Sequence, residues 1–277
     1  MSHFRFTHAV VCRVPDSMNN AIGVDKLIPI DIPKCRRQHE AYVQALRDAG
    51  LDVIELPADE QHPDCPFVED TAVVCNGAVL LCRPHSDTRR QEVQYMKSIL
   101  QKELELHVME ISDEAATLEG GDVLFTGREF FVGISERTNH AGAVALAKAF
   151  PEFPCSPIKI EGALHLKCLV TMAGPDVICV AKDKNAQVAL KRIESCASFT
   201  YKTLTVPDAA AANCVFANGF LLHRSQTDFP DSAKVFTSKL EQYKLRGLEW
   251  SELSKAWGSL SCCSILVKQP RVRRSHT

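Results

Sequence analysis

The sequence predicts an α/β fold in which five similar units close into a ring, and three observations carry this prediction. First, five stretches with apolar residues at three- and four-residue spacing predict helices, at 34–49, 86–104, 136–149, 184–197 and 230–244. Second, a β-branched run follows each helix. Third, tight turns of the hairpin kind recur about 45–50 residues apart. Because radial repetition protects the edges of small sheets, we predict a five-bladed α/β propeller.

Each predicted unit contributes a helix, a strand and a hairpin in the same order. The strands that follow the helices are LDVIELP, ELHVMEI, SPIKI, KTLTVP and RGLEW. The hairpins turn at NG (76–77), GR (127–128), AGPD (173–176) and NG (218–219). A fifth hairpin is missing from the interior, and the last strand, 261–268, can supply it by pairing with residues 8–14. The alternative is an α+β sandwich with accidental regularity, which the common phase of the turns disfavours.

Composition limits the partners and the compartment. The chain has 277 residues and a net charge of -2, which suits a single catalytic domain over 1–277 and predicts neither nucleic acid nor a membrane as partner. The basic tail RVRRSHT is too short to change this, and no signal peptide or membrane span is expected. Oligomeric state stays open.

The cysteines indicate a reducing compartment. Of twelve cysteines, six lie in apolar runs where a free thiol behaves as a small hydrophobe: Cys12, Cys75, Cys82, Cys168, Cys179 and Cys214. There is no C-x-x-C pair, so zinc-ribbon and thioredoxin interpretations have little support. We therefore expect a cytoplasmic protein with free thiols.

Polar residues recur just before the first strand of each hairpin. The segments are FVED (67–70), LEGGD (118–122), LHLK (164–167), AAN (211–213) and SCC (261–263). Equivalent positions of a closed ring converge on its axis, which gathers carboxylates, a histidine, an asparagine and a cysteine. Taken singly, each has a structural interpretation, such as a histidine satisfied in the core or a solvated acidic loop end. Their common phase instead favours a site for nucleophilic catalysis on a cation.

The adjacent Cys262 and Cys263 raise the question of which thiol takes part in chemistry. The stretch GSLSCCSILV is apolar and predicts a strand, on which neighbouring side chains point to opposite faces. Only one of the two can then face the axis. The glycines of LEGGDVLFTG do not form a G-x-G-x-x-G loop, and we expect them to allow a close approach to other backbone segments.

Several long blocks resemble one enzyme family. They are LPADEQHPDCPFVEDTAVV, ATLEGGDVLFTGREFFVGISERTN, HLKCLVTMAGP, LTVPDAAAANC and LSCCSILV. Over residues 8–267 the chain resembles dimethylarginine dimethylaminohydrolase, a family of the guanidino-group-modifying (arginine deiminase) superfamily. The resemblance implies the five-bladed α/β propeller called the pentein fold and no cofactor. It implies hydrolysis of free asymmetric dimethylarginine and monomethylarginine to citrulline plus dimethylamine or methylamine, which would relieve methylarginine inhibition of nitric oxide synthesis.

The resemblance also implies roles for individual residues. It makes Cys262 the nucleophile and His165 the acid–base group, with Glu119 standing where close relatives carry an aspartate beside the histidine. The implied substrate-binding residues are carboxylates around the guanidinium, arginines on the substrate carboxylate and apolar contacts at the amino-acid end: Asp64, Glu69 and Asp70; Arg89 and Arg137; Ile22 and Ala256. No metal is required, although Cys262 and His165 could take an inhibitory zinc ion.

The chemistry explains why these groups belong together. A guanidinium carbon is a poor electrophile, so carboxylates must hold the cation for attack. The bound cation lowers the pKa of a nearby thiol, and a histidine can then protonate the departing amine and activate water. The alternatives are an arginine deiminase-type hydrolase, a non-catalytic methylarginine-binding relative, or a metal-binding protein. Residues 15–34 are rich in turn formers, as expected of an active-site loop.

Overall fold

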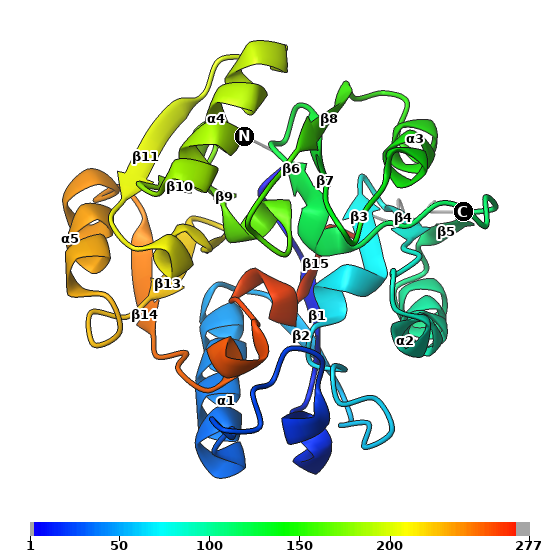
Figure 1. The fold of residues 1–277 in the computed structure, drawn as a ribbon, viewed down its shortest axis with the longest axis horizontal. Coiled ribbons are helices and arrows are strands. Elements are labelled where there is room, and N and C mark those ends of the chain that lie inside the picture. The colour runs from blue at the N-terminus through cyan, green and yellow to red at the C-terminus, as the bar shows by residue number, and fades with distance from the viewer. Residues whose placement is uncertain (1–2, 270–277) are drawn as a thin grey trace, which may run out of the picture.

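The computed structural model describes residues 3–269, so the basic tail at 271–277 lies outside the described residues. Five three-stranded sheets surround a central axis, and the five α-helices lie at the outside of the ring (Figure 1). In each sheet the central strand pairs antiparallel with one neighbour and parallel with the strand that follows a helix. The predicted five-bladed α/β propeller is confirmed.

The blades share one order of elements. The first consists of β15 (Ile265–Val267), β1 (His8–Cys12), α1 (Ile32–Asp48) and β2 (Asp52–Leu56). The second and third consist of β3 (Ala72–Cys75), β4 (Ala78–Leu81), α2 (Asp87–Ser98) and β5 (His107–Glu110), then β6 (Val123–Phe125), β7 (Phe130–Ile134), α3 (His140–Ala149) and β8 (Cys155–Lys159). The fourth and fifth consist of β9 (Val170–Gly174), β10 (Val177–Ala181), α4 (Lys184–Cys196) and β11 (Lys202–Val206), then β12 (Val215–Ala217), β13 (Phe220–Arg224), α5 (Pro230–Lys239) and β14 (Lys244–Leu248).

The ring closes through its two ends, as predicted. Strand β15 pairs antiparallel with β1, with Val10 opposite Ile265 and His8 opposite Val267. The last strand is nevertheless shorter than expected. Residues Ser261–Cys263 form a 3₁₀ turn, η8, ahead of the strand, so the prediction of strand geometry at the two cysteines was wrong.

The predicted helices all exist, and local chemistry explains where their ends differ. Helix α1 begins after Asp31, whose side chain accepts the N–H of Lys34 at 3.0 Å. Helix α3 begins only after Asn139, which accepts the N–H of Gly142 at 3.0 Å, so residues 135–139 are a loop and not helix. The prediction over 86–104 is divided between α2 and a π-helical turn at Ile99–Glu103.

The thiols are free, as expected. Each of the twelve cysteines is unpaired with another, and nine are buried, while Cys155 and Cys168 are half-buried and Cys196 is exposed. Within residues 3–269, no helix combines the length and the apolar character needed to cross a bilayer.

A short 3₁₀ turn stands directly before the first strand of every blade. These turns are η2 (Val68–Thr71), η4 (Gly120–Asp122), η5 (Leu166–Cys168), η6 (Ala209–Ala212) and η8. Turn η2 contacts η8 and η4, η4 contacts η5, and η5 contacts η6. The approach is so close that a Cβ at Gly120 would lie 1.9 Å from the carbonyl oxygen of Glu69. The predicted convergence of the polar segments, and the interpretation of the LEGGD glycines, are confirmed.

Candidate active site

A small pocket opens where turns η2, η4 and η8 meet. It is lined by nine of the ten residues that the sequence proposed for the site: Ile22, Asp64, Asp70, Arg89, Glu119, Arg137, His165, Ala256 and Cys262. At its mouth Trp257 packs so tightly on Gly23 that a Cβ there would lie 2.6 Å from the indole ring. The free volume is about 30 Å³, room for one or two waters. In this structure the pocket is therefore smaller than a whole amino acid.

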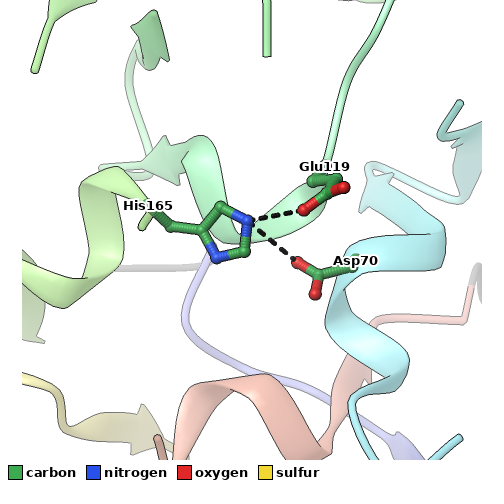
Figure 2. A group of neighbouring side chains, drawn as sticks. All are labelled: Asp70, Glu119 and His165. Atoms are coloured by element: carbon green, nitrogen blue, oxygen red, sulfur yellow. Dashed lines mark hydrogen bonds and ion pairs between the residues drawn. The ribbon is translucent and has the colours of Figure 1, made fainter. Parts of the chain in front are cut away.

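His165 lies between two carboxylates in this pocket. Its Nε2 is 2.7 Å from Oε2 of Glu119 and 3.9 Å from Oδ1 of Asp70 (Figure 2). Burial alone would lower the pKa of His165, but the charge of Asp70, the hydrogen bond to Glu119 and the charge of Asp122 together raise it to about 9. The imidazole is therefore protonated at neutral pH and can supply a proton.

Glu119 reaches the histidine despite its extra methylene relative to an aspartate. Its second oxygen, Oε1, accepts the backbone N–H of His85 at 3.0 Å, which fixes the carboxylate from its other side. Beneath the ring, a Cβ at Gly121 would lie 2.5 Å from Nδ1 of His165. The absence of a side chain at Gly121 therefore leaves the space that the imidazole of His165 occupies.

Asp70 is held by backbone and by a buried arginine. Its Oδ1 accepts the N–H of Gly121 at 3.1 Å, and its Oδ2 accepts from Nη1 of Arg89 at 2.7 Å. Burial opposes ionisation, but the charges of His165 and Arg89 outweigh it and lower the pKa of Asp70. Asp70 is therefore a carboxylate at neutral pH, as the handling of a cation requires.

Arg89 is already engaged in the resting structure. Its guanidinium also donates to Glu92, at 2.9 and 3.2 Å, and to the carbonyl oxygen of Phe67 at 2.9 Å. The observed contacts make Arg89 a support for Asp70. Its role on a substrate carboxylate stays a prediction.

Arg137 is differently placed. It is half-buried in the loop after β7, and within residues 3–269 its guanidinium makes no hydrogen bond or ion pair. Across the pocket, Asp64 accepts the backbone N–H of Ile22 at 3.1 and 3.2 Å, and burial raises the pKa of Asp64. The pocket therefore offers Arg137 as an available cation, while Asp64, which the resemblance assigns to the guanidinium, is hydrogen-bonded to the backbone of Ile22.

The two cysteines diverge because they lie on a 3₁₀ turn. Such a turn has about three residues per revolution, so successive side chains point about 120° apart. Cys262 lines the pocket, whereas Cys263 is fully buried in the apolar core. The expectation that Cys262 alone reaches the site agrees with this arrangement, although the strand argument for it was wrong.

The thiol of Cys262 is neutral in this structure. Burial raises its pKa, and the nearby charges of Glu69 and Asp70 raise it further. The backbone N–H of Ser259 lies 3.4 Å from its sulfur. A cationic ligand seated between the carboxylates and the sulfur would act in the opposite direction and favour the thiolate.

Glu69 is the one predicted site residue that the structure places outside the pocket. Its Oε1 accepts from Nζ of Lys167 at 2.5 Å, and its Oε2 accepts from the hydroxyl of Ser261 at 2.9 Å. These groups line a separate cavity of about 190 Å³ between the first strands of the blades. In this structure Glu69 is therefore engaged with Lys167 and Ser261 and does not line the pocket that holds Asp70.

Sequence reasoning missed several supporting residues. Glu92 carried a signal, because it lies three residues after Arg89 on one helix face. Lys167 and Asp122 lie in the recurring polar segments LHLK and LEGGD. The position of these segments in the repeat indicated that both residues lie near the axis, but it did not predict their partners. Trp257 had no periodic signal at all.

The structure groups three potential metal ligands around His165, and the inhibitory zinc at Cys262 and His165 stays a prediction. Asp70, Glu119 and His165 offer ligand atoms within 4.8 Å of one another, and Cys262 does not belong to this group. A metal binds neutral imidazole, so a cation here must first displace a proton from a histidine whose pKa is about 9. The arrangement favours the ion pair of His165 with its carboxylates.

The five-bladed ring with its polar turns gathered at one pocket is the pentein fold of the guanidino-group-modifying superfamily, which includes hydrolases of C–N bonds in linear amidines. A family model described as eukaryotic N,N dimethylarginine dimethylhydrolase matches residues 6–198. The chain belongs to the dimethylarginine dimethylaminohydrolase family.

Individual relatives cover nearly the whole chain. A human protein named DDAH2 is 40% identical over 276 residues, covering 96% of both chains. The dimethylarginine dimethylaminohydrolase of Pseudomonas aeruginosa is 26% identical over 266 residues, covering 94% of this chain and 99% of its own. A crystal structure of a mutant of the Pseudomonas enzyme with citrulline has a TM-score of 0.80 at 25% identity, covering 95% of this chain and all of that one.

Proposed function

We propose that this protein hydrolyses free asymmetric dimethylarginine and monomethylarginine to citrulline and the corresponding methylamine. The observation that carries the proposal is the assembly of Cys262, His165 and Asp70 around one pocket, with Arg137 available at its edge. Family membership supports the same substrates. The twelve free cysteines support a cytoplasmic location.

The proposed reaction has two halves. In the first, the Cys262 thiol loses its proton to solvent, its sulfur bonds to the guanidinium carbon and the C–N bond to the methylated nitrogen breaks, while His165 gives its proton to the departing amine. In the second, His165 takes a proton from water, the water oxygen attacks the same carbon, and the C–S bond breaks. The released thiolate takes up the second proton of the water as the urea group forms, so the thiol is regenerated and citrulline leaves. Asp70 and Asp64 hold the cation, and Arg137 donates hydrogen bonds to the substrate carboxylate.

The test is citrulline formation from asymmetric dimethylarginine with wild type, Cys262→Ser and the matched control Cys263→Ser. We expect Cys262→Ser to abolish turnover without loss of folding, and Cys263→Ser to retain most of it. Activity on arginine in place of dimethylarginine would indicate the deiminase reaction instead. Binding of dimethylarginine without turnover in the wild type would indicate a non-catalytic relative. The name of the 40% identical human protein states no substrate, so this assay is what separates hydrolysis of dimethylarginine from the alternatives.

A further inference from the structure

A third carboxylate, Asp122, lies behind the pocket and has no place in the proposed reaction so far. Its side chain is 0% exposed. Oδ1 accepts the backbone N–H of Leu166 at 2.8 Å, and Oδ2 accepts the hydroxyl of Ser135 at 2.7 Å. One buried carboxylate therefore ties turn η4 to turn η5 and to the loop after β7.

Both partners of Asp122 adjoin residues of the site. Leu166 directly follows His165. The Ser135 oxygen accepts the backbone N–H groups of Arg137 at 2.9 Å and Thr138 at 3.1 Å. The hydroxyl oxygen of Thr138 in turn accepts the N–H of Glu119 at 3.1 Å. The acid–base histidine, its carboxylate partner and the free arginine are thus connected through Asp122 by short hydrogen bonds.

The space around this carboxylate is shaped for it. A Cβ at Gly133 would lie 2.5 Å from Oδ1 of Asp122 and 2.8 Å from Cβ of Leu166. Burial raises the pKa of Asp122 to about 6, opposed by the charge of His165 and the hydrogen bond from Ser135. A buried carboxylate is costly unless its hydrogen bonds and nearby charge compensate it, and here both are present.

We propose that Asp122 is a positioning residue that aligns the two ends of the proposed reaction: it holds the turn that carries His165 and, through Ser135, the loop that carries Arg137. This inference rests on the proposed function. The negative charge of Asp122 also acts on His165, together with the charges of Asp70 and Glu119.

The two connections can be cut separately. Ser135→Ala removes the acceptor of the Arg137 loop and the hydroxyl that donates to Asp122, but leaves the Asp122 carboxylate and its bond to Leu166 in place, so KM for dimethylarginine should rise roughly tenfold while kcat stays within about twofold. Ser135→Thr keeps a hydroxyl and should restore KM. Asp122→Asn keeps an acceptor for Leu166 but removes the charge, so kcat should fall as well, and the pKa of His165 should fall.

The histidine titration is measured by ¹H–¹⁵N correlation spectra of the side chains without substrate. A lowered His165 pKa in Asp122→Asn, with an unchanged one in Ser135→Ala, supports the proposal because loss of folding would not separate the two variants in this way. A wild-type KM in Ser135→Ala, or a wild-type His165 titration in folded Asp122→Asn, would overturn it. If Asp122→Asn does not fold, Ser135→Ala and its threonine control decide.

The same variants keep this inference distinct from the proposed function. If wild type does not turn over dimethylarginine, the proposed function fails while the His165 titration still tests one connection. Calorimetric binding of citrulline to wild type and Ser135→Ala then tests the other, with roughly tenfold weaker binding expected of the variant. Equal affinity of the two proteins for citrulline would contradict the proposal that Asp122 positions the Arg137 loop through Ser135.

Discussion

Glu69 and Asp70 are neighbours in one turn, yet they belong to two polar networks on different sides of the central turns. Asp70 faces the pocket and lies with Arg89 and His165. Glu69 faces the second cavity and binds Lys167 and Ser261. We refer to these as the pocket network (Asp70, Arg89, Glu92, Glu119, His165) and the rear network (Glu69, Lys167, Asn213, Ser261).

The rear network joins turns to one another. Asn213 accepts the N–H of Ser261 at 2.9 Å and donates to the carbonyl oxygen of Lys167 at 3.0 Å. Together with the Glu69 contacts, these bonds hold η2, η5 and η8 around the base of Cys262. The charged and hydrogen-bonding groups of the rear network are paired with one another. We therefore infer that this network holds the turns in place and does not bind a ligand.

The pocket network is built to meet a ligand. It contains two cations, Arg89 and protonated His165. Three carboxylates pair with them: Asp70, Glu92 and Glu119. Asp64 and Arg137, which also line the pocket, balance each other, so one excess negative charge remains, and this suits a guanidinium. Two carboxylates adjacent in sequence therefore serve different purposes because one 3₁₀ turn points them apart.

The largest expected effect comes from the pocket side. Asp70→Asn removes the negative charge that lies 2.7 Å from Arg89 and 3.9 Å from His165, and with it one contact of the proposed guanidinium. With charge-assisted hydrogen bonds at roughly 1.5–3 kcal/mol each, kcat/KM for dimethylarginine should fall by about 100-fold. Steady-state kinetics and a thermal melt check this, with Glu69→Gln as the matched control. Unchanged kcat/KM would remove Asp70 from substrate handling.

The second prediction concerns stability against pH. The folded-state pKa of His165, about 9, lies above its ordinary value of 6.5, so its protonation stabilises the fold fully below pH 6.5 and no longer above pH 9. The loss across this window is on the order of 3 kcal/mol. Urea unfolding at pH 6.5 and pH 9 should show it in wild type and Glu69→Gln, and much less of it in His165→Gln. An equal pH dependence in His165→Gln would assign it to another group.

How much of this could be foreseen from the sequence differs between the networks. The phase of the repeats was enough to bring FVED, LEGGD, LHLK and SCC to one axis, because a closed ring superposes equivalent positions. It could not decide which way each side chain points. Strand alternation predicted opposite faces for Cys262 and Cys263, and the structure obtains a similar divergence from a turn. Glu69 turns from the pocket because Lys167, two residues beyond His165, neutralises it, and such a long-range pair leaves no local pattern.

The third prediction compares the two arginines. Arg137→Lys replaces a planar fork by a point charge, so KM for dimethylarginine should rise about tenfold. It should rise far less for dimethylated agmatine, which lacks the carboxylate. Measuring both substrates with both proteins gives a coupling term for the Arg137–carboxylate contact. A coupling of zero would leave Arg89 as the carboxylate anchor, at the expense of its contacts with Asp70 and Glu92.

The smallest expected effect on turnover belongs to the rear network, and it tests the comparison most directly. Glu69→Gln keeps an acceptor for the Ser261 hydroxyl but withdraws the charge that pairs Lys167. The Lys167 side chain is 17% exposed and borders the second cavity, so water can share its charge, and the loss of stability should be about 1–2 kcal/mol. Turnover should stay within about threefold of wild type with KM unchanged, since no rear group touches the pocket.

Lys167→Met is the matched variant, because it leaves the Glu69 carboxylate buried without its cation beside Cys262. It should be the less stable of the two and should lower kcat more, since an unneutralised charge there raises the pKa of the thiol further. Thermal melts and steady-state kinetics of both variants decide. If Glu69→Gln instead lost as much kcat/KM as Asp70→Asn, Glu69 would have to leave Lys167 and turn toward the guanidinium when substrate binds. That result would restore the role that the family resemblance implies for it and would make the separation of the two networks a property of the resting enzyme alone.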